Sequence, residues 1–302
     1  MPLGLISRSC APVLTYHACF EEVPPSVAAI DNVSPQRLHD HLQILKRRFR
    51  FVSVDELSEA KRLRGLAAVT FDDGYKSVIQ NALPVMNALG IPFTIFVNTN
   101  ALEGKVLWRH KLIYAIKNQY PVGLPGSAAP PEDLYRESKT ARYHSRIIED
   151  QLDAVLHEKN VTLPNYLFDE PSCFVKHPLV WYGNHSHNHY VLSSLSLKEQ
   201  REELSRTKQV LDGISGINVS RVFALPFGET HHANSDTCTA LRELGYRALL
   251  MNRGGVNFGP LRQTEGIHVV ERLSPNEQKI NWILTRELAL TCRMPALRYA
   301  AC

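Results

Sequence analysis

The sequence predicts an α/β protein built on a sheet of parallel strands. Short apolar runs rich in β-branched and aromatic residues recur along the 302-residue chain. Most are followed by a polar turn and a segment with helical periodicity. This alternation of strand and helix is typical of parallel sheets. The predicted strands are residues 13–16, 51–54, 67–71, 93–97, 179–182, 222–225, 248–251 and 267–270.

Helices are predicted between several of these strands from the residues at their ends. Residues 34–48 begin with Ser34 as N-cap and Pro35 at the first helical position, followed by leucines on one stripe. Residues 81–90 and 193–213 each end at a glycine, the residue that most often terminates a helix. We therefore expect these segments to form the outer layer of a repeating strand-helix fold.

Residues 103–175 interrupt this rhythm with a long segment that is rich in proline and glycine near its centre. We expect residues 1–302 to form one domain, with residues 103–175 inserted between two strands. Loops at the carboxyl ends of parallel strands build the active sites of such folds. The insertion is therefore expected to cover the site or to select the substrate.

Composition excludes several classes of protein. The net charge is +4 and the basic residues are scattered along the chain, so no nucleic-acid partner is expected. The six cysteines form no CxxC pair and are too few for a disulfide framework. No run of 18 apolar residues predicts a transmembrane segment, and the first residues lack a signal-peptide pattern. A cytoplasmic location is expected, with association at the inner face of the membrane as an alternative.

Two adjacent carboxylates follow the predicted strand 67–71. The sequence there is TFDDGY, which contains Asp72 and Asp73. A strand end followed by glycine can direct both side chains into one pocket, one toward a metal ion and one toward the water molecule that the ion activates. Considered alone, Asp-Asp-Gly is more typical of an ordinary turn or a helix cap than of a catalytic site.

A histidine-rich segment, GNHSHNH, follows the predicted strand 179–182. His185 and His189 are four residues apart, a spacing at which two imidazoles can bind one ion. A mixed set of histidine and carboxylate ligands suits zinc or another first-row divalent metal. A third strand, 222–225, ends in a turn formed by Pro226, Phe227 and Gly228, which can direct a backbone N–H group at an oxyanion or can be a simple turn.

Together, TFDDGY, GNHSHNH and LPFG resemble the signature motifs of the polysaccharide deacetylase family in their order, spacing and position at strand ends. This family has the NodB homology domain and is also called carbohydrate esterase family 4. The resemblance extends from residue 10 to about residue 275. It implies a distorted (β/α)7-type barrel, here with an insertion.

The resemblance also implies roles for four residues. Asp72 corresponds to the catalytic base, and Asp73, His185 and His189 correspond to the protein ligands of one divalent metal ion. Zinc is the expected metal, with cobalt, nickel or manganese as alternatives. Beside these four residues, the turn after the third strand is expected to direct the Phe227 N–H at the oxyanion of the proposed reaction.

The sequence departs from the family pattern at two places. Ala224 stands where many members have the arginine that orients the base, and the late Leu-x-His motif that supplies the general acid is missing. The N-terminal Tyr-His motif resembles the exopolysaccharide deacetylase branch, so His17 is expected to be the acid, with His268 as the alternative. Arg272 is a candidate to replace the missing arginine.

These assignments imply a metal-dependent hydrolase that removes an N-acetyl or related acyl group from a sugar, oligosaccharide or glycoconjugate in bacterial surface polysaccharide biosynthesis. Tyr75, Pro226 and Phe227 are expected to contact the substrate. The alternatives are a deformylase or O-deacetylase of the same fold, or a carbohydrate-binding protein without catalytic activity.

Overall fold

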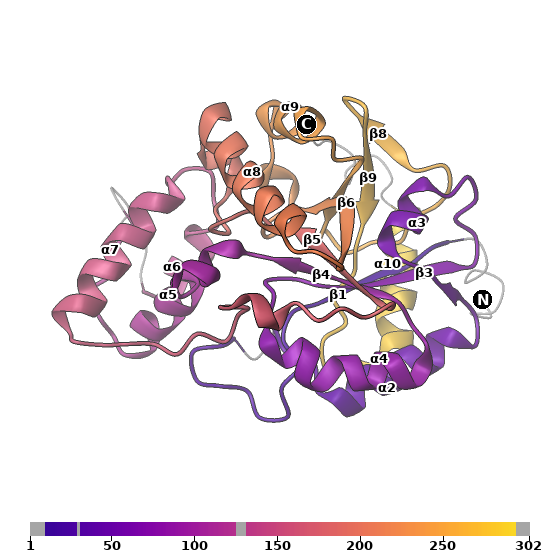
Figure 1. Ribbon diagram of the computed structural model, residues 1–302, viewed down its shortest axis with the longest axis horizontal. Coiled ribbons are helices and arrows are strands. Elements are labelled where there is room, and N and C mark those ends of the chain that lie inside the picture. Colours follow the sequence, from indigo (N-terminus) through magenta and orange to yellow (C-terminus); the bar gives the residue numbers. More distant parts are fainter. Residues whose placement is uncertain (1–9, 29–30, 125–130, 294–302) are drawn as a thin grey trace.

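The computed structural model describes residues 10–28, 31–124 and 131–293 (Figure 1). The expectation about the N-terminal segment rests partly on residues 1–9, which lie outside this range. In the described chain, nine strands form one sheet, and eight of them run parallel. Seven of these parallel strands lie side by side in the order β1 (Val13–Tyr16), β3 (Leu66–Phe71), β4 (Phe93–Val97), β5 (Val180–Asn184), β6 (Asn218–Ala224), β7 (Ala248–Met251) and β9 (Ile267–Glu271).

The sheet curls until its two sides meet. Leu273, two residues after β9, forms a parallel bridge with Leu14 of β1. The Leu273 N–H donates to Val13 O at 3.0 Å, and the Thr15 N–H donates to Leu273 O at 2.9 Å. The remaining strands are short: β2 (Arg50–Phe51) pairs with β3, and β8 (Arg262–Thr264) pairs antiparallel with β9. The distorted (β/α)7-type barrel predicted from the sequence is therefore confirmed.

Helices surround this barrel and connect its strands (Figure 1). The three helices predicted from their end residues are present, although the second begins with a π-helical turn before its α-helical part. The helices and helical turns outside the insertion are α2 (Pro35–Lys46), α3 (Val54–Glu59), η2 (Val78–Ala82), α4 (Leu83–Leu89), η5 (Leu192–Ser194), α8 (Leu197–Gly213), η6 (Thr230–His232), α9 (Ser235–Glu243) and α10 (Ile280–Arg293).

The predicted strand 51–54 is too long, because Val54 begins α3. The Ser53 hydroxyl caps this helix by accepting a hydrogen bond from the Glu56 N–H at 3.1 Å. Val54 and Leu57 are buried in one cluster with inward-facing residues of β1, β3, β6, β7 and β9. Helix α3 therefore closes the amino-terminal end of the barrel, and the carboxyl end stays available for a site.

The insertion lies beside the barrel as a layer of helices, at the left of Figure 1. It follows η3 (Thr99–Glu103) and contains α5 (Trp108–Lys117), α6 (Pro131–Glu137), α7 (Ser145–Glu158) and η4 (Pro171–Cys173). Trp108, Leu112 and Ile148 from α5 and α7 are buried in the same cluster as Tyr190 and Phe223 of the barrel. Shared packing of this kind fixes the insertion against the carboxyl end of β5 and β6.

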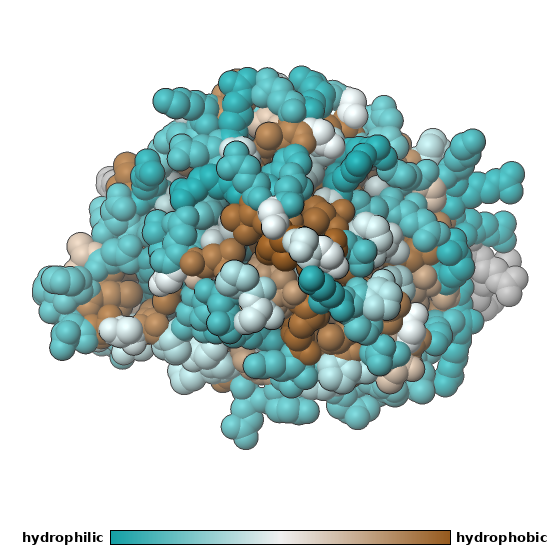
Figure 2. All heavy atoms as spheres, viewed as in Figure 1, coloured by the Kyte–Doolittle hydropathy of each residue, from teal (hydrophilic) through white to brown (hydrophobic). Residues whose placement is uncertain are grey.

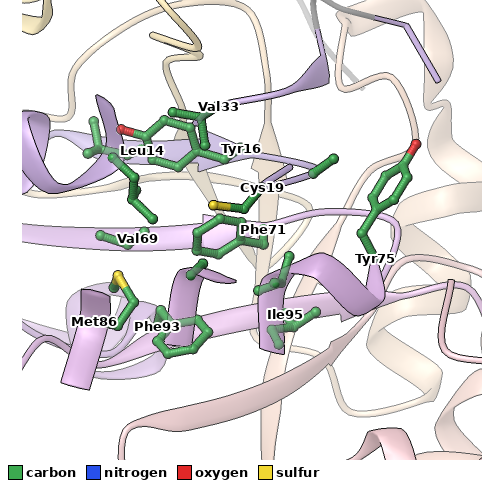
Figure 3. Close-up of a cluster of buried hydrophobic side chains, with 14 of the residues drawn as sticks. Leu14, Tyr16, Cys19, Val33, Val69, Phe71, Tyr75, Met86, Phe93 and Ile95 are labelled. Carbon is green, nitrogen blue, oxygen red and sulfur yellow. The ribbon is translucent and has the colours of Figure 1, made fainter. Parts of the chain in front are cut away.

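Another buried cluster lies between the barrel strands and the helices α2 and α4. Figure 3 shows Tyr16, Phe71 and Phe93 among its members, and Phe71 lies 5.6 and 5.7 Å from the other two rings between centroids. On the face of the molecule seen in Figure 2, hydrophilic residues cover most of the surface, and apolar residues gather near the centre of the view. No helix in the described part of the chain combines the length and apolar character needed to cross a bilayer.

Candidate active site

Asp72 is the first residue after β3, and it is paired with Arg272, the first residue after β9. The Arg272 guanidinium donates two hydrogen bonds to the carboxylate, from Nη1 to Oδ1 at 2.7 Å and from Nη2 to Oδ2 at 2.8 Å. Both side chains are buried. Burial alone would raise the pKa of Asp72, but the attraction of Arg272, and then of His185, outweighs it and lowers this pKa to about 2. The carboxylate is therefore ionised throughout the neutral range.

Asp73, His185 and His189 converge beside this pair. The Oδ1 atom of Asp73 lies 3.5 Å from Nε2 of His185 and 3.3 Å from Nε2 of His189. One potential ligand atom from each of the three residues lies within 4.8 Å of the others, and all three side chains are buried. The parallel strands explain the convergence, because β3 and β5 end at the same edge of the sheet.

The donor atoms of this group fit a divalent cation. Burial lowers the pKa of His185 and of His189, so both imidazoles are neutral at pH 7 and can offer a lone pair. His185 donates from Nδ1 to Ala224 O at 2.8 Å, which leaves its Nε2 lone pair facing Asp73. Neither carboxylate oxygen of Asp73 has a hydrogen-bond partner in the described chain. A cation among these groups would satisfy the carboxylate and both lone pairs.

The backbone around these residues takes conformations that are rare outside functional sites. Asp73, Ser186 and His189 have φ values of 69°, 64° and 58°. Local hydrogen bonds hold the histidine segment, because the His189 N–H donates to Ser186 Oγ at 3.0 Å, and Asn98 Nδ2 donates to the His185 and Ser186 carbonyls. The surrounding structure therefore fixes the direction of the imidazoles.

A buried carboxylate anchors the same segment from outside. Glu203 on α8 accepts two hydrogen bonds from Asn188, from the backbone N–H at 2.8 Å and from Nδ2 at 2.6 Å. His187 lies on this segment but is not one of the three converging residues, and its Nδ1 lies 2.9 Å from the Thr99 hydroxyl. These contacts tie the segment to α8 and η3.

His17 is the first residue after β1 and is partly exposed. Its charge acts on the pKa of Asp72, Asp31 and His189, so it lies within electrostatic range of each. Its Nδ1 is buried and has no hydrogen-bond partner among the described residues. The structure thus brings His17 to the same end of the barrel as Asp72.

Phe227 borders the histidine pair. Its ring centroid lies 4.7 Å from that of His189, and its φ of 63° turns the chain after β6. The preceding residue, Pro226, is buried, and its carbonyl accepts from the Gly228 N–H at 2.8 Å. Within the described residues, the Phe227 N–H has no hydrogen-bond partner, so this donor remains available.

Tyr75, which was expected to contact the substrate, is buried in the protein. Its side chain is only 1% exposed, and its hydroxyl lies 2.7 Å from Nε2 of His110. Figure 3 shows the hydroxyl group directed away from Phe71 and Ile95. Gly74, with a φ of 77°, turns the chain so that the tyrosine packs into the protein behind Asp73.

His268 lies at the wrong end of the barrel for the role of an alternative acid. It is the second residue of β9, four residues before Arg272, and its Nδ1 lies 3.0 Å from Ser58 O. Ser58 belongs to α3, which closes the amino-terminal end. The placement of His268 therefore leaves His17 as the histidine near Asp72 that could serve as an acid.

Sequence reasoning missed Arg109 and Asp31. Arg109 on α5 of the insertion lies 3.9 Å from Asp73 through Nη1, and its Nη2 donates to Asp31 at 3.2 Å and also to the Tyr135 hydroxyl. Burial would raise the pKa of Asp31, but Arg109 and His17 lower it overall. Neither residue belongs to a recognisable motif, and their meeting depends on how the insertion folds onto the barrel.

Comparisons with known proteins agree with this geometry. A family model described as "Polysaccharide deacetylase" matches residues 60–137 and 173–249, which include Asp72, Asp73, His185, His189 and Phe227. No curated protein sequence matches the chain significantly.

Several solved structures are similar to the fold. The deacetylase PplD of Streptococcus pyogenes, solved with acetate, is 18% identical with a TM-score of 0.56, over 92% of this chain and 98% of that one. IcaB of Ammonifex degensii is 19% identical with a TM-score of 0.54, over 91% and 97%. A de-N-acetylase from Aggregatibacter actinomycetemcomitans is 14% identical with a TM-score of 0.53, over 91% and 98%.

At these identities, the solved structures show only a shared fold. The family model matches about half of the chain, and the matched residues include the motifs TFDDGY and GNHSHNH, which contain Asp73, His185 and His189. The resemblance inferred from TFDDGY, GNHSHNH and LPFG is thereby confirmed, and the chain belongs to the polysaccharide deacetylase family.

Proposed function

We propose that the protein is a metal-dependent hydrolase that removes an N-acetyl group from a sugar or glycoconjugate. The observation that carries this proposal is the buried carboxylate of Asp73, which lacks a hydrogen-bond partner among the described residues and faces His185 and His189. These three residues would hold one divalent ion, with zinc as the first choice. When bound, such an ion polarises an acyl carbonyl and lowers the pKa of a water molecule.

In this proposal Asp72 takes the proton from the attacking water. A carboxylate whose pKa is about 2 is a weak base, so it acts on a water molecule that has already been made acidic. Arg272 holds both oxygens of Asp72 and thereby fixes the direction in which the carboxylate accepts the proton. The Phe227 N–H, which has no hydrogen-bond partner among the described residues, would donate to the developing oxyanion.

The leaving amine must be protonated before the amide bond can break, because an amide anion is a very poor leaving group. His17 is the candidate for this step, since it lies at the carboxyl end of β1 within electrostatic range of Asp72. A His17→Ala variant is expected to lose most of its turnover while it keeps its metal. Full activity in that variant would remove His17 from the mechanism.

The first experiment measures metal content and acetate release on the same purified samples. Wild-type protein should contain about one equivalent of divalent metal and release acetate from N-acetylated sugars. A His185→Ala/His189→Ala variant should lose both. The matched control is His39→Ala/His157→Ala, which also removes two imidazoles but leaves the converging group intact, and it should keep both properties.

Parallel assays separate the alternatives of the same fold. Release of formate from an N-formylated sugar, or of acetate only from an O-acetylated sugar, would replace the proposed N-deacetylase activity with that of a deformylase or an O-deacetylase. Binding of glycan without release of any acyl group, by protein that contains metal, would instead establish a carbohydrate-binding protein and overturn the proposal.

A further inference from the structure

The insertion places two cationic side chains against aromatic rings beside the candidate active site. The guanidinium carbon of Arg109 lies 5.6 Å from the ring centroid of Tyr135 and 5.4 Å from that of Phe227. The ammonium nitrogen of Lys139, which follows α6, lies 3.9 and 5.8 Å from the same two centroids. Cations are attracted to the faces of such rings. Phe227 also packs against His189, so both cations border the converging group.

The two cations differ in their partners. Arg109 has two carboxylates, Asp31 at 3.2 Å and Asp73 at 3.9 Å, together with the Tyr135 hydroxyl. The Lys139 ammonium has no hydrogen bond and no carboxylate within ion-pair distance in the part of the chain that the structure describes. Among the described residues, the ammonium thus lies over the faces of two rings and has no anion in direct contact.

The two carboxylates that act on the pKa of Lys139 are engaged or exposed elsewhere. Asp31 and Glu229 both act on the pKa of Lys139, but Asp31 is bound to Arg109, and the Glu229 side chain is 62% exposed and lies 3.8 Å from Nδ1 of His231. Burial and then repulsion by Arg109 lower the pKa of Lys139 to about 8. At pH 7 the side chain is still mainly a cation, and it lies partly buried without an anion.

We propose that Lys139 is a specificity-determining residue that binds a phosphate group on the N-acylated sugar. The acyl group would lie at the histidine pair, the sugar against the ring of Phe227, and the phosphate on the far side of that ring, at the ammonium. A compact ammonium without a partner suits the charge of a phosphate oxygen. The proposal rests on the proposed function, because it assumes that an acylated sugar occupies the site.

Steady-state kinetics on charged and neutral substrates test the proposal. The probes are the 1-phosphate and the 6-phosphate of N-acetylglucosamine, UDP-N-acetylglucosamine, and the uncharged methyl glycoside of N-acetylglucosamine. Wild-type protein should show a lower KM for at least one phosphorylated probe than for the methyl glycoside. The pattern among the three phosphorylated probes distinguishes a terminal phosphate from a diphosphate linkage.

Three variants assign the effect to Lys139. Lys139→Met, which keeps the length of the side chain without its charge, should raise the KM for the preferred phosphorylated probe about tenfold relative to the methyl glycoside, with a small change in kcat. Lys139→Arg should recover most of the preference. Lys159→Met removes one lysine from the same insertion, where it pairs with Glu158, and should keep the wild-type preference.

A wild-type enzyme without any preference for phosphorylated probes would overturn the inference while leaving the proposed function intact. Equal effects of Lys139→Met on charged and neutral substrates would overturn it as well. If no probe releases acetate, the proposed function fails, and calorimetry still decides the inference. In that case, binding of a sugar phosphate that weakens about tenfold in Lys139→Met supports the subsite, and equal or absent binding refutes it.

Discussion

Arg272 lies 200 residues beyond Asp72 in the chain, yet its two terminal nitrogens donate to the two oxygens of that carboxylate. The bond from Nη1 measures 2.7 Å and the bond from Nη2 measures 2.8 Å. The pair forms because β3 and β9 both end at the carboxyl edge of a barrel that closes through Leu14 and Leu273. Closure of the barrel thus brings Arg272 to Asp72, and we propose that it orients this carboxylate in place of the arginine that is expected at Ala224, the last residue of β6.

Loss of this pair should be costly to stability. Arg272→Met leaves Asp72 buried without a cation, and we expect the free energy of unfolding to fall by roughly 3–5 kcal/mol. Urea denaturation at pH 7 measures this loss. Arg247→Met is the control, because Arg247 pairs with Glu59 on the surface, where such pairs contribute about 1 kcal/mol or less. Similar losses in both variants would contradict the importance assigned to the buried pair.

The same pair makes a prediction about pH. The pKa of Asp72 in the folded protein is about 2, below its ordinary value of 3.8. The stabilisation from the ionised pair is therefore complete above about pH 4 and is lost as the pH falls toward 2. In Arg272→Met the pKa of Asp72 should rise, so the acid limb of the activity profile should shift to higher pH. An acid limb that does not move would show that another group controls it.

Glu203 offers a second test, because it supports the segment that carries two of the proposed metal ligands without being one of them. Glu203→Gln replaces one acceptor oxygen with a donor and so removes one of the two hydrogen bonds from Asn188. Since Asn188 lies between His185 and His189, metal affinity should fall about 10–100-fold. Competition with a chelator of known affinity measures the change. Glu202→Gln alters the exposed neighbouring residue and should leave affinity at the wild-type value.

The sequence was sufficient to predict the barrel and the strand-end positions of Asp72, His185 and Phe227. The physical reason is that parallel strands place their carboxyl ends at one edge, so polar residues after three apolar runs must be neighbours. The meeting of Asp31 with Arg109 could not be predicted in this way. It depends on how the insertion packs against the barrel. Apolar contacts determine this packing, and they correspond to no recognisable motif in the sequence.

Two residues lie in surroundings that differ from those expected of them, for local physical reasons. Tyr75 was expected to face the substrate. The positive φ of Gly74 instead turns the tyrosine side chain into the protein, where its hydroxyl forms a hydrogen bond with His110. His268 was retained as an alternative acid because it is the nearest candidate for the late Leu-x-His motif, but it is the second residue of β9. A position at the start of a strand, however, points to the opposite end of the barrel from a position after it.

Gly183 in β5 is predicted to tolerate no larger residue. It pairs in register with Phe96 of β4, and a Cβ atom at this position would overlap Cε1 and Cδ1 of the Phe96 ring. Gly183→Ala should therefore lower the free energy of unfolding by about 1–3 kcal/mol and disturb His185, two residues further on.

A double-mutant cycle tests this explanation. Phe96→Leu in the Gly183→Ala background removes part of the ring that causes the overlap, so it should cost less than Phe96→Leu alone. Denaturation curves of the four proteins give the coupling energy. Additive losses would mean that Gly183 is needed for some reason other than contact with Phe96.

His110 provides the last prediction, which concerns stability against pH. The imidazole is buried, and burial, followed by repulsion from Arg109, lowers its pKa to about 3. Because the unfolded chain binds this proton near pH 6.5, the unfolded state gains protons first, and stability falls as the pH drops from about 6.5 toward 3. The other buried histidines whose pKa is lowered contribute in the same direction, so the contribution of His110 must be isolated.

The Tyr75→Phe/His110→Phe variant removes both partners of the buried hydrogen bond and thus leaves neither polar group unsatisfied. In metal-free samples, we compare how much free energy of unfolding each protein loses when the pH drops from 6.5 to 5. The loss in the variant should be smaller than the loss in the wild type by about 2 kcal/mol. His157→Phe, at an exposed position on α7, should keep the wild-type slope. Parallel curves for wild type and the double variant would mean that His110 does not stay neutral in the folded protein, and the hydrogen bond to Tyr75 would then need another explanation.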